Sequence, residues 1–230
     1  MDAPLLAIEG VDGAGKSTVT ALLVDVLRAR GHDVATYDFP VYDAPRFGPL
    51  IARFLRGGFG PMNQSEPWFV GMLFAGNRAE LAPALRADAA AGRVVVTDRF
   101  SYSNVAFQSA KLGPDEDRDA FADWLAHLEF EAFGVPRPAV SFWLHVPLAL
   151  RPGLAAERGD REYLDGAVDV HEADESLQLR VHEAYAYLAA TRPDVETIEC
   201  APDGVLLPPA AVAEALWDRM AALDVLPPPR

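Results

Sequence analysis

The stretch Leu5–Thr18, LLAIEGVDGAGKST, places a short apolar run directly before three glycines, a lysine and two hydroxyl side chains. The run Leu5–Ile8 predicts a buried strand, and the following TVTALLVDVLRARG has apolar residues at helical spacing up to a stop at Gly31. Between them, Gly10–Ser17 matches the pattern GxxxxGK followed by Ser or Thr. A strand before this pattern and a helix after it indicate a phosphate-binding loop rather than an incidental glycine-rich turn.

The residue types of this loop define its expected chemistry. Glycines let the backbone direct successive N–H groups at phosphate oxygens, and the helix that follows adds its positive N-terminal dipole. Lys16, one of two lysines in the chain, is expected to reach the β- and γ-phosphates of a nucleoside triphosphate, and Ser17 to offer its hydroxyl to Mg²⁺. The residues expected to contact the triphosphate are Gly10, Val11, Asp12, Gly13, Ala14, Gly15, Lys16, Ser17 and Thr18.

The overall composition narrows the class of protein. The 230 residues are 50% hydrophobic and fit a single globular domain. A formal net charge of −14 argues against general affinity for nucleic acid or for an anionic membrane. Cys200 is the single cysteine, which excludes an intrachain disulfide and predicts a reducing, cytoplasmic compartment. We expect neither a signal peptide nor a membrane-spanning helix, because no apolar run is long enough.

Strand-like and helix-like segments alternate along the rest of the chain. Further strands are predicted in DVATYDFP, RVVVTD, AVSFWLHV and VETIEC. Further helices are predicted around FGPLIARFLRGG, over 65–92, and in DRDAFADWLAHLEFEAFG, ESLQLRVHEAYAYLAA and PAAVAEALWDRMAAL. This alternation predicts an α/β fold with three α/β/α layers and a five-stranded parallel sheet. Ligands bind such sheets beyond the carboxyl ends of the strands, so we expect the site at Glu9–Thr18, Phe39–Asp43 and Asp98–Asn104.

Motor proteins, GTPases and kinases share this phosphate loop, so further residues must distinguish between them. The absence of an NKxD motif, which binds guanine, disfavours a GTPase. Asp98 and Arg99 follow one strand together, which suggests an anionic second substrate beside the metal. Phe74 and Arg78 are four residues apart on one helical face, so they can stack on a base and donate to its exocyclic oxygen. Asn104 can donate to and accept from a base edge. A core position for Phe74 and a solvated loop position for Asn104 stay open as alternatives.

The segments EGVDGAGKST, FPVYD, LFAGNRAEL, DRFSYSNVAFQ and DVHEADESLQLRVHEAYAYLA together resemble thymidylate kinase, a P-loop kinase family. The resemblance runs in order over nearly the whole chain. It implies one P-loop kinase domain over 1–230 with a mobile lid at about 151–170. It also implies phosphorylation of dTMP to dTDP for dTTP synthesis, with Mg²⁺ as cofactor, ATP and dTMP as small-molecule partners, and a homodimer.

The resemblance also implies roles for individual residues. Phe74 would stack on thymine, Arg78 would donate to its carbonyl oxygen, and Asn104 would read the base edge. The residues implied in phosphoryl transfer are Lys16, Asp12, Asp98, Arg99 and the lid arginines Arg158 and Arg161. The residues implied in dTMP binding are Phe39, Tyr42, Phe74, Arg78, Arg99, Asn104, Phe107, Asp169 and Glu172. Those implied beside the metal are Ser17 and Asp98.

Two departures from the family pattern affect these expectations. Val41 stands where the family often has arginine, which shifts acceptor-phosphate binding toward Arg99. Ala14 stands where some members carry an arginine, which leaves the lid arginines to approach the triphosphate. Two other functions stay open: a deoxynucleoside kinase acting on thymidine, which needs a general base for a neutral 5′-hydroxyl, and a non-catalytic P-loop nucleotide-binding protein.

Overall fold

The computed structural model describes residues 2–60, 65–113, 117–150 and 175–228. All five predicted strands are present and form one parallel sheet in the order β2-β3-β1-β4-β5. Their bounds are β1 Leu5–Glu9, β2 Val34–Asp38, β3 Val94–Asp98, β4 Val140–His145 and β5 Val195–Glu199. Because β1 pairs with both β3 and β4, the strand that precedes the phosphate loop lies at the centre of the sheet.

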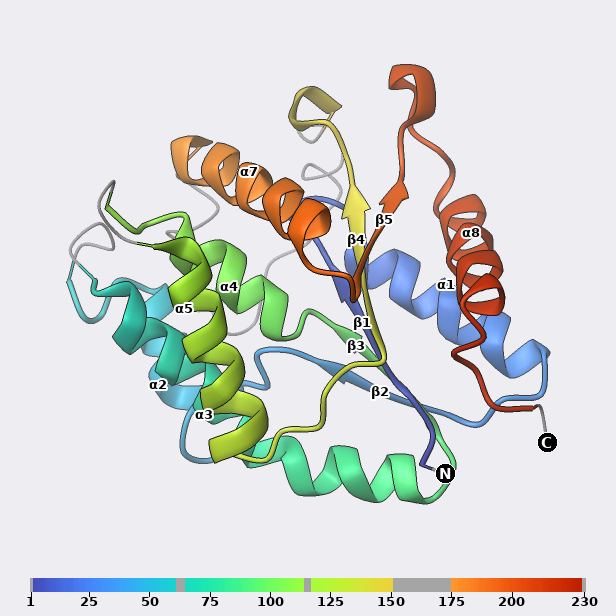
Figure 1. Ribbon diagram of the computed structural model, residues 1–230, viewed down its shortest axis with the longest axis horizontal. Coiled ribbons are helices and arrows are strands. Elements are labelled where there is room, and N and C mark those ends of the chain that lie inside the picture. The colour runs from blue at the N-terminus through green and yellow to red at the C-terminus, as the bar shows by residue number, and fades with distance from the viewer. Residues whose placement is uncertain (1, 61–64, 114–116, 151–174, 229–230) are drawn as a thin grey trace.

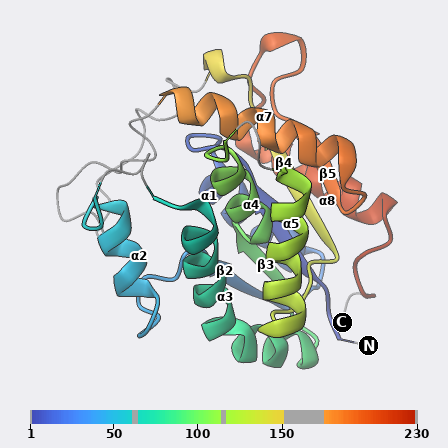
Figure 2. The same cartoon turned by 60° about the vertical axis from the view of Figure 1, so that its left-hand side comes forward.

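Helices cover both faces of this sheet (Figure 1). On one face, α1 (Lys16–Ala29) packs against α8 (Pro209–Ala222). The other face carries α3 (Pro67–Ala90), α4 (Ser101–Ser109), α5 (Arg118–Ala126) and α7 (Glu175–Thr191), while α2 (Gly48–Leu55) packs against α3 at the periphery (Figure 2). The predicted three-layer α/β/α fold is confirmed.

The central strand is buried on both faces, as a strand in a covered parallel sheet must be. Leu6 and Ile8 belong to the same apolar cluster as Leu23 of α1. Leu5 and Ala7 belong to a second cluster, which contains Leu85 of α3. Packing on both faces fixes where β1 ends, and therefore where the phosphate loop begins.

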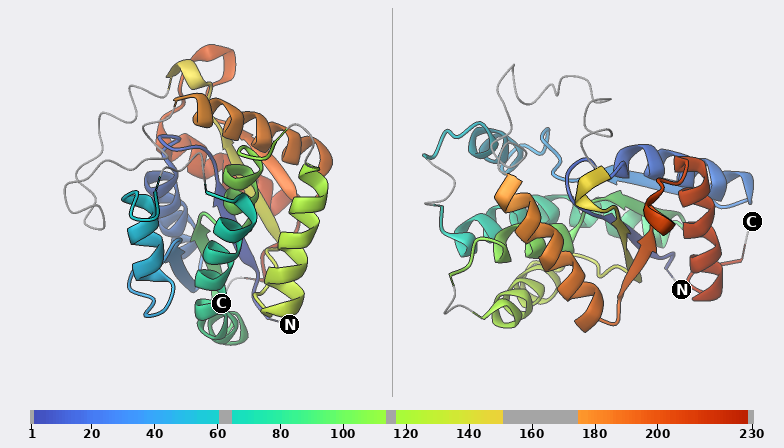
Figure 3. Two further views of the ribbon diagram at one scale, coloured as in Figure 1. Left: turned by 90° about the vertical axis from the view of Figure 1, so that its left-hand side faces the viewer. Right: turned by 90° about the horizontal axis from the view of Figure 1, so that it is seen from above.

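The carboxyl ends of the strands lie on one edge of the sheet, and the two chain ends lie at the opposite edge (Figure 3). Near that opposite edge, Ala3 and Pro227 line the same small pocket. Among the helices that the structure describes, none combines the length and apolarity that crossing a bilayer would require.

Two segments differ from the sequence prediction. The pattern predicts no helix after Arg99, yet Ser101–Ser109 form α4, and their polar side chains are buried rather than solvated. The helix expected in DRDAFADWLAHLEFEAFG divides into α5 and a π-helical turn, η2 (His127–Ala132). The first difference arises because the polar side chains of α4 are buried, so apolar periodicity does not indicate this helix. The second is a change of helical hydrogen bonding within a segment that is helical as predicted. Two short 3-10 turns, η3 (Leu148–Leu150) and η5 (Pro202–Gly204), complete the described elements.

Candidate active site

The phosphate loop connects the end of β1 to the start of α1. Gly15 is the N-cap of α1 and has φ 77°, a left-handed conformation that favours glycine. The first-turn N–H groups of α1 therefore face the loop, as the N–H groups at a helix N-terminus do in anion sites. The buried Lys16 ammonium donates a hydrogen bond to the Val11 carbonyl oxygen at 2.9 Å. The lysine thus lies across the loop itself.

Ser17 and Asp98 meet where α1 begins and β3 ends. The Ser17 hydroxyl donates to Oδ2 of Asp98 at 2.8 Å, whereas Oδ1 is buried and has no hydrogen-bond partner among the described residues. A hydroxyl and a carboxylate are hard oxygen ligands that suit Mg²⁺, which completes its shell with water and phosphate oxygens. The described ranges contain no group of three or more His, Cys, Asp or Glu side chains that could hold a metal ion. A metal ion at Ser17 and Asp98 would therefore need water or phosphate oxygens as further ligands. The two residues therefore fit the predicted Mg²⁺ position.

Arg99 follows β3 with φ 64°, a conformation that non-glycine residues rarely adopt. Its backbone N–H donates to the Ile8 carbonyl oxygen at 2.8 Å, which fixes this turn against β1. Its guanidinium is ion-paired with Asp12 and also donates to the Gly10 carbonyl oxygen at 3.2 Å. Burial opposes the charge of Arg99, but the acidic groups around it, with Asp12 the strongest and Asp98 and Glu9 also contributing, together raise the Arg99 pKa. A permanent cation therefore lies where the loop meets α4.

A cavity that is partly open to solvent lies beside this ion pair. It is lined by residues from the phosphate loop, the β2–α2 segment, α2, α3 and the segment from the end of β3 through α4. Every described residue that the sequence predicted for dTMP binding lines it: Phe39, Tyr42, Phe74, Arg78, Arg99, Asn104 and Phe107. The predicted lid at 151–170, with Arg158 and Arg161, and also Asp169 and Glu172, lie outside the described residues.

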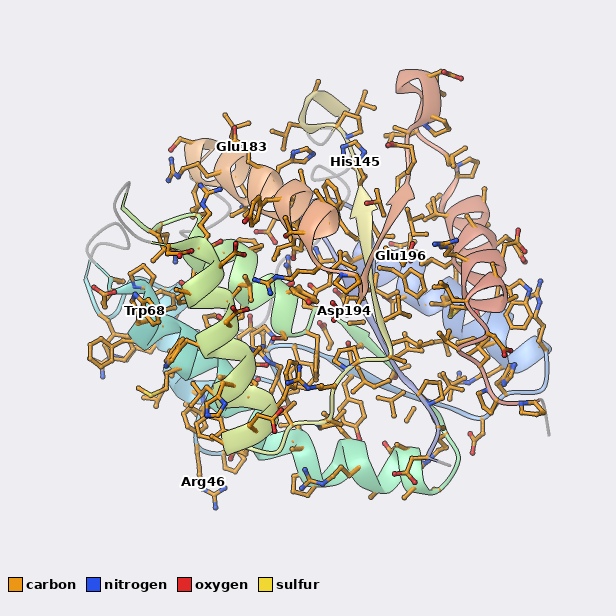
Figure 4. The ribbon with its side chains drawn as sticks, in the orientation of Figure 1. Arg46, Trp68, His145, Glu183, Asp194 and Glu196 are labelled. Carbon is orange, nitrogen blue, oxygen red and sulfur yellow. The ribbon has the colours of Figure 1, made fainter. Side chains whose placement is uncertain are left out.

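The β2–α2 segment is held against α3 by side-chain hydrogen bonds. Asn77 accepts from the Val41 N–H at 2.8 Å and donates to the Val41 carbonyl oxygen at 2.9 Å. Glu80 accepts from the Arg46 N–H at 3.0 Å. These bonds hold Tyr42 at the cavity. The Arg46 side chain is 78% exposed and points away from the sheet (Figure 4). It therefore does not take the place of the arginine that the family often has at the position of Val41.

Three side chains at the site have no role assigned from the sequence. Glu129 of η2 is fully buried and ion-paired with Arg78 of α3. Gln178 of α7 is also buried and donates to Oδ2 of Asp12 at 2.9 Å. Glu9, the third, ends β1. Glu9 and Gln178 lie within segments that carry the family resemblance, whereas the only sequence signal for Glu129 is a polar residue inside an otherwise apolar pattern.

Glu9 is a carboxyl group buried next to Arg99. Its Oε1 accepts from the Phe100 N–H at 3.1 Å, and its Oε2 accepts from the hydroxyls of Ser103 and Tyr185. Burial raises the pKa of Glu9, and the hydrogen bond from Ser103 only partly opposes this rise. The network ties β1, α4 and α7 together at the edge of the sheet where the cavity opens.

Because of this raised pKa, Glu9→Gln should become more stable relative to the wild type as the pH rises. The folded state binds the Glu9 proton more tightly than the unfolded state, whose pKa is near 4.5. The wild type therefore loses stability as pH rises from about that value through the folded pKa, whereas glutamine has no such proton. Urea unfolding at several pH values between 4.5 and 8 measures the difference. Glu183→Gln, on the exposed side of α7 (Figure 4), is the control, and parallel curves for wild type and Glu9→Gln would contradict this expectation.

Several known proteins resemble this chain in sequence or in fold. The thymidylate kinase family model matches residues 8–201. A thymidylate kinase of Mycobacterium tuberculosis is 38% identical over 189 residues, which cover 81% of this chain and 86% of that protein. A probable thymidylate kinase of Thermococcus kodakarensis is 32% identical over 207 residues, covering 86% and 90%. The solved thymidylate kinase of Candida albicans, 20% identical, shares the fold with a TM-score of 0.70 over 97% of this chain and 93% of that chain. The chain belongs to the thymidylate kinase family.

Proposed function

We propose that the protein transfers the γ-phosphoryl group of ATP to dTMP, forming dTDP and ADP. The observation that carries this proposal is the ion pair between Arg99 and Asp12. It joins a phosphate loop to a cavity that is lined by aromatic side chains and by the polar side chains of Arg78 and Asn104. Family membership supports the same reaction. A cytoplasmic location fits a chain with the single cysteine Cys200.

The acceptor nucleotide would occupy the cavity with its base between α3 and α4. Phe74 is only partly buried and packs edge to face against Phe54, with 6.4 Å between ring centroids. Its ring would stack on thymine, while Arg78 would donate to a carbonyl oxygen and Asn104 would read the adjacent edge. Phe107 lies beneath the Arg99 guanidinium, 5.3 Å from ring centroid to guanidinium carbon, and would face the deoxyribose. Phe39 and Tyr42 would complete the wall.

Phosphoryl transfer here needs positioning and charge neutralisation rather than a protein nucleophile. A non-bridging oxygen of the dTMP phosphate attacks the γ-phosphorus. The bond from that phosphorus to the β–γ bridging oxygen breaks, and ADP leaves with its electron pair. Lys16 and Arg99 would offset the charge on the phosphoryl oxygens, together with Arg158 or Arg161. Mg²⁺, held by Ser17 and Asp98, would neutralise charge on the triphosphate.

The deoxynucleoside kinase alternative is less well supported by this geometry. It requires a free carboxylate to deprotonate a neutral 5′-hydroxyl. Asp12 is the carboxylate of the described residues that lines the cavity, and it is held by Arg99 and Gln178. An arginine at this position suits an acceptor that already carries a phosphate. A non-catalytic role would not require a lysine in the phosphate loop or a serine hydroxyl beside Asp98.

A panel of acceptors tests the reaction. With ATP and Mg²⁺, coupled ADP release should be fastest with dTMP, and its kcat/KM should exceed those for dCMP and thymidine by at least about a hundredfold. The reason is that dCMP presents the wrong polar edge and thymidine has no phosphate for Arg99. Preferred use of thymidine would favour the deoxynucleoside kinase. No ADP above the enzyme-free rate with any acceptor would favour the non-catalytic protein.

Lys16→Ala should lower kcat by at least about a hundredfold, because it removes a positive charge from the triphosphate in the transition state. Circular dichroism should show an unchanged fold. The matched control is Lys111→Ala, which removes the only other lysine, whose ammonium donates to Gln108 at 3.0 Å. Similar rates for Lys16→Ala and Lys111→Ala would contradict the role of the phosphate loop.

We further propose that the protein is a homodimer that uses the exposed face of α3. Phe69 is 69% exposed and Met72 is 42% exposed, and these two large apolar residues lie one helical turn apart. Sedimentation equilibrium should give twice the chain mass of 24.9 kDa, and Phe69→Glu should shift the protein toward the monomer. A monomeric wild type at micromolar concentration would refute this part of the proposal.

A further inference from the structure

We propose that Glu129 is a positioning residue that sets the hydrogen-bond polarity of base recognition. It fixes the direction of the Arg78 donor and the orientation of the Asn104 amide, whose oxygen is then the acceptor. The cavity therefore accepts an imide edge, as in thymine or uracil, and rejects the amino-substituted edge of cytosine. This inference rests on the proposed function and adds to it a residue that no sequence motif identifies.

The first step is the pairing of Arg78 with Glu129. Nε of Arg78 donates to Oε2 at 2.8 Å, and Nη2 donates to Oε1. The side chains are 3% and 0% exposed, so this two-point contact holds the guanidinium plane in one orientation. The Nη1 group receives no acceptor from the described residues, although Arg78 lines the cavity. It is therefore a donor of fixed direction.

The second step is the orientation of the Asn104 amide. Its Nδ2 donates to the Gly71 carbonyl oxygen at 2.8 Å and approaches Oε1 of Glu129 at 3.4 Å. These two contacts use both hydrogens of the amide nitrogen, so the opposite amide orientation would place an oxygen against two acceptors. Oδ1 is left buried, without a hydrogen-bond partner in the described part of the chain, in a residue that is 4% exposed and lines the cavity. It is an acceptor that a ligand donor would satisfy.

The two steps combine into one recognition pattern. A donor from Arg78 beside an acceptor from Asn104 matches the C4 carbonyl oxygen and the N3–H of thymine or uracil. Cytosine carries an amino group at C4 and an unprotonated N3. Its amino group would therefore face the Arg78 donor, and its N3 acceptor would face the Asn104 oxygen. Glu129 touches both side chains and balances the Arg78 charge, so a neutral base can bind without an uncompensated buried cation beside it.

The backbone explains how one carboxylate reaches both helices. Glu129 lies on η2, the π-helical turn that follows α5, and such turns often occur at functional sites. This turn packs against α3, and α4 packs against both α3 and α5 (Figure 2). Two residues along the same turn, the Glu131 side chain is 58% exposed and pairs with Arg137 at the surface. The two glutamates therefore offer a matched pair for experiment.

The test compares Glu129→Gln with Glu131→Gln in the full chain, using dTMP and dCMP as acceptors. Glutamine keeps the shape of Glu129 but replaces one acceptor with a donor, which repels an Arg78 donor and permits the Asn104 amide to turn. We expect the KM for dTMP to rise about tenfold or more, with kcat and the KM for ATP within about threefold of the wild type. The ratio of kcat/KM for dTMP over dCMP should fall by about tenfold or more. Glu131→Gln should match the wild type in all of these.

Each other outcome decides a different question. If the wild type does not phosphorylate dTMP, the proposed function fails. If the wild type does so and Glu129→Gln keeps the wild-type dTMP-to-dCMP ratio, the role of Glu129 is overturned and the proposed function stands. A proportional loss with both acceptors would show general damage and would also overturn it. If Glu129→Gln does not fold, Glu129→Asp keeps the charge with a shorter reach. A folded Glu129→Asp with the wild-type ratio would then reject the inference, and a lowered ratio would support it.

Discussion

The ion pair between Arg99 and Asp12 is the contact on which the arrangement of the site depends. It joins the turn after β3 to the phosphate loop after β1, so two strand ends that are adjacent in the sheet share one charge pair. Arg99 reaches this position through a left-handed backbone conformation, which is energetically unfavourable. The hydrogen bond to the Ile8 carbonyl oxygen and the electrostatic attraction of the buried Glu9 carboxyl group offset this cost. Gln178 holds the other side of Asp12. In the proposed reaction, the pair would connect the binding regions of the two nucleotides and set their separation.

The chain is strongly acidic, and the cations at the site are few, each held by its own partner. Lys16 binds a carbonyl oxygen of the loop, Arg99 pairs with Asp12, and Arg78 pairs with Glu129. The Arg99 pair is partly accessible, with side chains 17% and 11% exposed, whereas the Arg78 pair is almost fully enclosed. A partly accessible pair can exchange a partner for phosphate, while an enclosed pair keeps its geometry. This difference agrees with phosphate binding at Arg99 and with the reading of a neutral base at Arg78.

The sequence alone predicted the parts of the structure that rest on local chemistry. Glycine spacing defined the phosphate loop, and apolar runs defined the five strands, because both signals lie within a few neighbouring residues. It did not predict α4, whose polar residues are buried against other elements, or the role of Glu129, which is 51 residues from Arg78. Gln178 is 166 residues from Asp12. A buried polar side chain is recognisable in a sequence only through its partner, and these partners become neighbours only after the sheet has formed.

The two ends of the cavity place opposite demands on the same polypeptide. At the phosphate end the charge changes during each turnover, so the groups there must be able to exchange partners, as the carbonyl-bound Lys16 and the partly accessible Arg99 can. At the base end nothing ionises, and discrimination depends on leaving the wrong base with unpaired groups, which requires donors and acceptors that cannot turn. Buried polar networks specify one geometry only when every member is satisfied. Oδ1 of Asn104 has no partner among the described residues, so a ligand donor would complete this network. In the role proposed for Glu129, the network that orders the helices on this face would also select the substrate.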